Sequence, residues 1–348
     1  MGKIKFTDKN GSFVIENPEN YSGLYLPLAG EMGLKSNITP SMAGDAKTDQ
    51  DHFLLEPVSI ENLHNNKNGR NFWCRIEGKG IWSVSGASAL QEAEKFTASQ
   101  DESKIEAGLM WQKLTRISKK YGIKSEVLSF VPTDKNIEIM YVTLENTSAE
   151  SIKFTPVAAI PLYGRSADNI RDHRHVTSLL HRISTQEYGI EVSPVLSFDE
   201  RGHQKNSTTY FVYGSKEDGT KPETFYPTNE MFIGEGGSFL NPEAVRTVKE
   251  GVKAGAKIQG KEAVGALAFE SVELKAGEKT GYIVVAGITD DVLEIEKTTV
   301  LYRTKEAVLE CFENTKRHWV EKVNIDFEMN DDSVDNYLKW ICFQPILR

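Results

Sequence analysis

The sequence predicts a mainly β protein, a large antiparallel sandwich over residues 1–288 followed by α-helices over residues 289–348. Short stretches of alternating apolar and polar residues recur up to about residue 285. They are separated by turns, which is typical of a sandwich. After Asp290 the apolar residues recur at helical spacing instead. A chain of 348 residues is long enough to bury a large core.

Hairpins are expected where turn residues separate two alternating stretches. Lys9-Asn10-Gly11 lies between residues 4–6 and 13–15, and Asn-Gly accepts the positive φ angles of a tight turn. Residues 77–80 are expected to join a second pair of strands in the same way. Two more hairpins are predicted, one with its return strand beginning at Ile152 and one turning at residues 276–279. A short helix is expected over residues 87–96.

The segment after Asp290 predicts helices. Thr304 is a suitable N-cap for a helix whose apolar side includes Val308, Phe312 and Trp319. A final helix is expected to open at residues 331–333 and is apolar around most of its circumference. Such a helix needs burial on several sides, so we expect exposed apolar surface on it and a further domain after it.

Composition excludes several classes of function. The formal net charge is −9, which argues against a nucleic-acid binder, because such proteins neutralise phosphates with Lys and Arg. No apolar run approaches the roughly 20 residues that span a bilayer, and the first residues lack the apolar core of a signal peptide, so a cytoplasmic location is expected. Three widely spaced cysteines support neither a disulfide framework nor a zinc site. No cofactor is expected.

The most informative segment is residues 165–182, which holds four arginines and three of the seven histidines. Such side chains are costly to bury unpaired, so they are expected to face acidic groups, a polar ligand or another subunit. A metal site is disfavoured because the arginines oppose a cation. The mixture of donors and acceptors suits sugar hydroxyls, and the alternative is a loop that is merely ordered by salt bridges. The candidate substrate-binding residues are Arg165, Asp168, Asn169, Arg171, Arg174 and His175.

Three other features have competing interpretations. Residues 225–238 are aromatic and then glycine-rich, which suits a saccharide platform or a plain loop between two strands. Asp199 and Glu200 suggest a glycosidase pair, but neighbouring residues on a strand face opposite ways and cannot flank one bond. Trp73, Trp82 and Trp111 are expected in the core.

Several stretches together resemble the N-terminal part of an inverting glycoside phosphorylase of glycoside hydrolase family 94, nearer the laminaribiose and β-1,3-oligoglucan branch than the cellobiose branch. They are LYLPLA (24–29), NFW (71–73), GKGIWS (78–83), YGRSADN (163–169), DHRHVTSLLHR (172–182), SFDERGH (197–203) and FIGEGGS (232–238). The resemblance implies a β-supersandwich related to the galactose mutarotase-like fold, then linker helices, then a catalytic (α/α)₆ barrel. The barrel is missing from these residues, and residues 331–348 resemble the linker helix.

The resemblance also implies how the family works. A barrel aspartic acid protonates the glycosidic oxygen while inorganic phosphate attacks the anomeric carbon, so no catalytic residue is expected in this chain. A loop of the sandwich reaches the active site of the partner subunit in a homodimer and frames the acceptor sugar. The six candidate residues are expected to contact acceptor hydroxyls or to brace that loop.

The leading interpretation is therefore the sandwich and linker of a β-glucan disaccharide phosphorylase, with little activity by itself. One alternative is a free-standing carbohydrate-binding or assembly module that complements a separate barrel chain. The other is an independent sugar enzyme such as an aldose epimerase, using a histidine and a carboxylate on the sandwich face.

Overall fold

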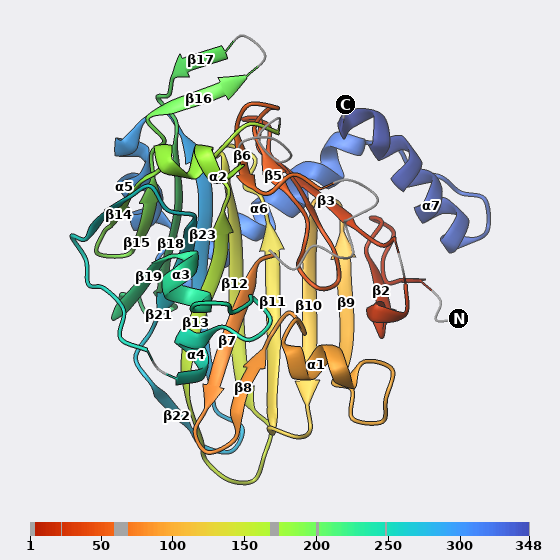
Figure 1. The fold of residues 1–348 in the computed structure, drawn as a ribbon. Helices are drawn as coiled ribbons and strands as arrows, with labels where there is room; N and C mark the ends of the chain where they lie inside the picture. The colour runs from red at the N-terminus through yellow and green to blue at the C-terminus, as the bar shows by residue number, and fades with distance from the viewer. Residues whose placement is uncertain are drawn as a thin grey trace.

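The computed structural model describes residues 4–21, 23–58, 69–167, 174–199, 202–247 and 249–347. Within these residues the chain forms the predicted large antiparallel sandwich, with helices concentrated after residue 291 (Figure 1). None of the helices in the described ranges is long and apolar enough to cross a membrane.

The larger sheet has eleven strands, all paired antiparallel. In spatial order they are β1 (Lys5–Phe6), β2 (Phe13–Glu16), β9 (Glu102–Gly108), β10 (Trp111–Ser118), β11 (Ile123–Phe130), β12 (Ile137–Asn146), β23 (Lys279–Thr289), β18 (Thr209–Lys216), β15 (Gly189–Val192), β14 (Arg182–Thr185) and β20 (Lys257–Gln259). The central strand β12 is buried on both faces, because alternate side chains enter two different cores. Met140 and Val142 face the second sheet, whereas Ile139 and Tyr141 face the helices.

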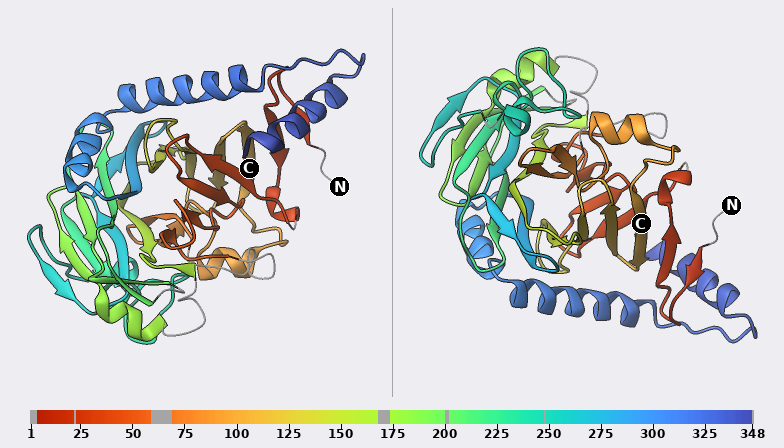
Figure 2. Two further views of the ribbon diagram at one scale, coloured as in Figure 1. Left: turned by 90° about the horizontal axis from the view of Figure 1, so that it is seen from above. Right: turned by 90° about the horizontal axis from the view of Figure 1, so that it is seen from below.

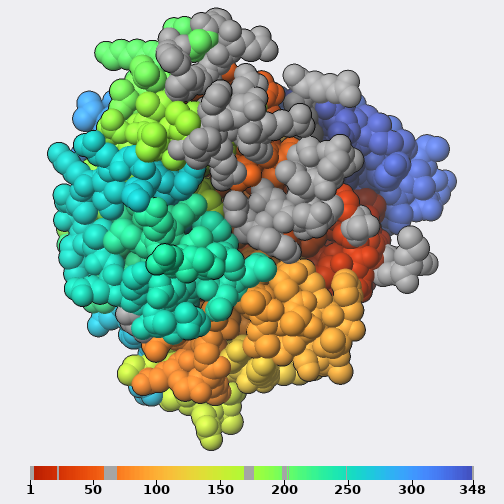
Figure 3. Space-filling model, viewed as in Figure 1, coloured from red at the N-terminus to blue at the C-terminus, as the bar shows by residue number. Residues whose placement is uncertain are grey.

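A six-stranded sheet packs against the inner face of the larger one. It contains β19 (Thr224–Thr228), β21 (Ala263–Ala268), β13 (Ile152–Leu162), β7 (Asn71–Ile76), β8 (Gly80–Ser83) and β22 (Val272–Leu274). Its outer face is covered by α3 (Asn229–Ile233) and α4 (Glu243–Thr247), whose segment is blue-green in Figure 3. Burial on both faces explains the fully buried, uninterrupted apolar run of β21.

Smaller elements complete the sandwich. They are a four-stranded sheet of β3 (Leu26–Ala29), β4 (Lys35–Ile38), β5 (Ala46–Lys47) and β6 (Phe53–Leu55), a hairpin of β16 (Leu196–Asp199) and β17 (Gly202–Lys205), helices α1 (Ala89–Glu94) and α2 (Arg174–Thr177), and 3₁₀ turns at Pro18–Asn20, Ser178–Leu180 and Gln344–Leu347. Ser88 caps α1 by accepting a hydrogen bond from the Gln91 amide, which is why the expected helix begins there.

Two of the four expected hairpins are present, and two are not. β1 pairs with β2, and β7 pairs with β8, with positive φ at Gly11 and Gly78 in their turns. The segments expected to return at Ile152 and after residues 276–279 instead cross from one sheet to the other. Both crossings meet at Asn146, whose side-chain amide donates to the carbonyl of Leu274 at 2.9 Å and to that of Glu150 at 2.7 Å.

Three longer helices follow Thr289, where β23 ends. They are α5 (Val292–Leu301), α6 (Lys305–Val323) and α7 (Asp332–Phe343). The Thr304 side chain caps α6, as predicted. α6 runs along the outer face of the eleven-stranded sheet, and α7 lies beside the N-terminal hairpin (Figure 2).

α7 is less apolar on its buried side than the sequence suggests. Asn336 and Lys339 are buried on the face towards the N-terminal hairpin, where Asn336 accepts a hydrogen bond from the Gly11 amide at 2.8 Å. Exposed apolar surface on this helix is present as expected, in a stripe of Val334, Tyr337 and Ile341.

A buried ion pair joins the three sheets. Arg70, next to β7, donates to Glu138 of β12, and its Nη2 lies 2.8 Å from Glu138 Oε2 and 2.6 Å from Ser36 Oγ of β4. The Arg70 and Glu138 side chains are 1% and 5% exposed. A lone charge at this depth would be strongly unfavourable, so each residue depends on the other.

We expect Arg70→Met to lower the free energy of unfolding by about 3–5 kcal/mol, because it leaves the Glu138 carboxylate buried without its partner. Urea unfolding followed by tryptophan fluorescence measures this change. The double variant Arg70→Met/Glu138→Leu should recover part of the loss, and Lys119→Met, which breaks the exposed pair with Glu102, should change the midpoint little. A single variant as stable as wild type would show that the pair does not hold the sheets together.

Candidate functional site

The first candidate residue, Arg165, lies just beyond the end of β13, where the six-stranded and four-stranded sheets meet. Its carbonyl accepts a hydrogen bond from the Phe53 amide at 2.9 Å, and the Gly164 amide donates to the Phe53 carbonyl at 3.0 Å. Gly164 has φ of +60°, which favours glycine. The backbone at Arg165 is therefore fixed on both sides before the chain enters residues 168–173, which the structure does not describe.

The Arg165 side chain is buried and braced. It is 3% exposed, and its Nη2 donates to Glu262 Oε2 at 2.6 Å. Its guanidinium also lies over the Tyr163 ring, with Cζ 4.9 Å from the centroid. Within the described part of the chain, Nε and Nη1 are buried and make no hydrogen bond, so the guanidinium keeps donors that Glu262 does not use.

His181 is buried close to this arginine. Its Nδ1 lies 3.2 Å from the Lys261 carbonyl, and its Nε2 is buried and makes no hydrogen bond to any residue that the structure describes. Burial, together with the positive charge of Arg165, lowers the pKa of His181 to about 3. The imidazole is therefore neutral at physiological pH, and the bond at Nδ1 leaves Nε2 as an acceptor.

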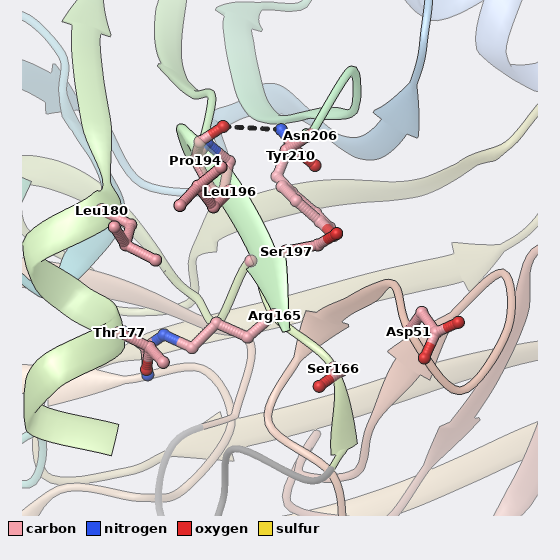
Figure 4. Close-up of a pocket in the computed structure, with 11 residues that line it drawn as sticks. Asp51, Arg165, Ser166, Thr177, Leu180, Pro194, Leu196, Ser197, Asn206 and Tyr210 are labelled. Atoms are coloured by element: carbon pink, nitrogen blue, oxygen red, sulfur yellow. Dashed lines mark hydrogen bonds between the residues drawn. The ribbon is translucent and has the colours of Figure 1, made fainter. Parts of the chain in front are cut away.

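A small polar hollow adjoins Arg165 (Figure 4). It is lined by Asp51, Gly164, Arg165, Ser166, Thr177, Leu180, Pro194, Leu196, Ser197, Asn206 and Tyr210. Its volume is about 10 Å³, which is room for roughly one water molecule and not for a sugar ring. Within the described residues, this end of the sandwich is a polar, braced support and not a formed saccharide pocket.

The other predicted site residues lie wholly or partly outside the described residues. Asp168, Asn169 and Arg171 belong to the segment that is not described. Arg174 and His175 are in the backbone of α2, but their side chains are not described. Their sugar contacts stay predictions, and the geometry of Arg165 favours bracing over sugar contact. In the parts of the chain that the structure describes, no three His, Cys, Asp or Glu side chains gather as a metal site requires.

The proposed saccharide platform at residues 225–238 is wrong. Phe225, Tyr226 and Phe232 are buried at 0–4% exposure. Phe225 lies in the core between the two sheets, whereas Tyr226 and Phe232 lie in the core that α3 and α4 form with the outer face of the sheet. The glycine loop connects these two helices, and not two strands as expected. Trp73 and Trp82 are in the core as predicted, whereas Trp111 is only half-buried, with its ring edge against Phe312.

Glu262 is the important residue that the sequence did not reveal. It lies 97 residues from Arg165 and has no motif around it. The pairing of Leu162 with Ala263 between β13 and β21 brings the two together. Only this register, which depends on strands far apart in the sequence, predicts the ion pair.

These features define a large antiparallel β-sandwich domain, and comparison with known proteins gives its family. Residues 43–305 match the family described as "Glycosyl hydrolase 94, supersandwich domain". The chain belongs to glycosyl hydrolase family 94 through this domain. No curated protein matches it.

Comparison with solved structures gives a fold match at low sequence identity. A bacterial glucoamylase complexed with acarbose is 9% identical, with a TM-score of 0.52 over 97% of this chain and 42% of its own. A putative kojibiose phosphorylase from the human microbiome is 10% identical, with a TM-score of 0.49 over 99% of this chain and 42% of its own. The chain thus spans less than half the length of these two proteins.

Because His181 is neutral when folded, it should make the protein less stable on acidification. Below its unfolded pKa of about 6.5 the unfolded chain gains a proton that the folded chain does not, so stability falls from about pH 6.5 towards pH 3. Between pH 7 and pH 5 this histidine should account for about 2 kcal/mol of the loss. In urea unfolding at both pH values, His181→Gln should show a drop smaller by that amount. An equal drop in wild type and variant would contradict a neutral, buried His181.

Proposed function

We propose that this chain is the sandwich and linker part of an inverting β-glucoside phosphorylase that acts with a catalytic (α/α)₆ barrel. The match of residues 43–305 to the glycosyl hydrolase 94 supersandwich carries this proposal. The choice of a β-1,3-linked glucoside such as laminaribiose rests on the motifs at residues 163–169 and 172–182. The products are α-glucose 1-phosphate and the acceptor sugar, and inorganic phosphate is the co-substrate.

In this reaction phosphate attacks the anomeric carbon from the face opposite the leaving sugar, which inverts the configuration. The glycosidic oxygen takes a proton from an acid of the barrel as the C–O bond breaks. Phosphate is already a competent nucleophile, so no general base is needed. The sandwich therefore helps to position the acceptor sugar and takes no part in proton transfer.

The contribution of this chain is a loop that frames the acceptor sugar of a partner subunit in a cytoplasmic homodimer. Arg165 anchors the start of that loop through Glu262 and Tyr163. This partly buried ion pair fixes the position from which the loop starts, which lowers the entropy cost of binding. Asp168, Asn169, Arg171, Arg174 and His175 are the residues proposed to reach the sugar hydroxyls.

The first test is the formation of glucose 1-phosphate from laminaribiose and phosphate. The 348-residue chain alone should give none, and the chain combined with a family-94 barrel should give turnover. Turnover by the chain alone would overturn the assignment of the acid to the barrel. Tight oligosaccharide binding that needs no barrel would favour the free-standing carbohydrate-binding module instead.

The second test concerns the ion pair of Arg165 with Glu262 in the chain combined with a barrel. Arg165→Met and Glu262→Gln should each raise KM for the acceptor sugar roughly tenfold in the synthetic direction and leave kcat largely unchanged, because the chemistry lies elsewhere. The double variant should be no worse than either single one, since both remove the same ion pair. Lys261→Met, which breaks the neighbouring exposed pair with Glu230, is the matched control and should keep the wild-type KM. An unchanged KM in Arg165→Met would exclude a positioning role.

A further inference from the structure

A second hollow lies on the other side of the eleven-stranded sheet, between β15, β18 and helix α5. It encloses about 320 Å³, within the range of small-molecule sites. It is lined by Gln186, Glu187, Tyr188, Glu191, Tyr213, Val292, Leu293, Glu296, Thr299 and Arg303, which we call the α5 cleft. No residue of the α5 cleft lines the hollow beside Arg165.

The helix wall of the α5 cleft is one continuous stripe. Val292, Glu296, Thr299 and Arg303 recur at intervals of three and four residues and so lie on one face of α5 and its C-terminal turn. Val292 and Leu293 are 54% and 67% exposed. The stripe therefore has apolar side chains at the N-terminal end of α5 and polar side chains towards its C-terminal end.

The sheet wall carries two tyrosines in fixed positions. Tyr213 donates its hydroxyl hydrogen to Glu191 Oε1 at 2.5 Å, and Gln186 Nε2 donates to the other oxygen of the same carboxylate at 3.0 Å. The Arg303 guanidinium lies over the Tyr188 ring, with Cζ 3.9 Å from the centroid. These contacts hold the wall rigid without a ligand.

Two polar groups of the α5 cleft are left without partners. Arg303 Nε is buried and makes no hydrogen bond to the residues that the structure describes. Glu296 is exposed and makes no hydrogen bond or ion pair within the described part of the chain. A smaller hollow of about 10 Å³ continues inward past Tyr188, Tyr213 and Arg303. The cleft thus has an unused donor and an unused acceptor.

From this combination we propose that the α5 cleft binds a neutral gluco-oligosaccharide. Carboxylates and the guanidinium form hydrogen bonds with hydroxyls, while the exposed Val292 and Leu293 side chains contact the C–H faces of sugar rings. Glu187 is paired with Lys221, so Glu191 and Glu296 against the Arg303 guanidinium leave the cleft acidic, which disfavours phosphorylated or acidic sugars. The site is additional to the acceptor loop and holds an oligosaccharide on the outside of the sandwich.

The test is calorimetric titration of the full chain with glucose trisaccharides that are β-1,3-, β-1,4- or α-1,4-linked, and with glucose 1-phosphate. At least one trisaccharide should bind saturably and glucose 1-phosphate should not. Glu296→Gln should weaken binding about tenfold, as expected for losing a hydrogen bond to a charged group. Glu310→Gln, the same change at an exposed position on α6 outside the cleft, should bind as wild type.

The outcomes separate this proposal from the proposed function, on which only the choice of glucose oligomers rests. No binding of any trisaccharide, equal binding by Glu296→Gln and wild type, or equal losses in Glu296→Gln and Glu310→Gln would each overturn the α5 cleft as a saccharide site. So would binding of glucose 1-phosphate as tight as that of a trisaccharide. Binding of the α-1,4-linked trisaccharide alone would support the cleft and count against a β-glucoside as the natural ligand.

Discussion

The arrangement of the sandwich depends on one buried ion pair, that of Arg70 with Glu138. It is placed where three sheets converge, and Ser36 of the third sheet accepts a further hydrogen bond from the same guanidinium. Glu138 is the second residue of β12 and lies buried on the inner face of that strand. Hydrophobic packing alone would allow the sheets to slide, whereas a bidentate pair is satisfied at only one relative position. The pair therefore fixes register between sheets more than it adds stability.

The fold class was readable from the sequence because periodicity is a local property. The hairpin at Asn10-Gly11, the cap at Thr304 and the change from strand to helix each depend on a few neighbouring residues. The two false hairpins were not local errors, since β12 and β13 are real strands. Whether a strand returns to its own sheet or crosses to the other depends on partners such as β23, more than 130 residues away. No short-range pattern holds that information.

The candidate site also combines features that the sequence predicts with features that only the fold reveals. The concentration of arginine and histidine at residues 165–182 identified the segment, and the buried position of Arg165 accords with its expected need for an acidic partner. The identity of that partner, Glu262, came only from the register of β13 and β21. The α5 cleft was invisible in the sequence because its tyrosines and carboxylates come from four separate elements with no shared motif.

The packing of α7 on the N-terminal hairpin has a consequence for biosynthesis. Gly11 is bonded to Asn336 and to Trp340, which follow it by 325 and 329 residues. At ordinary translation rates those partners emerge on the order of tens of seconds later. During that interval the first two strands form the edge of the largest sheet without their cover, and an open edge is a template for pairing with another chain. The order of synthesis thus leaves this edge uncovered until α7 emerges, and chaperone dependence should concentrate there.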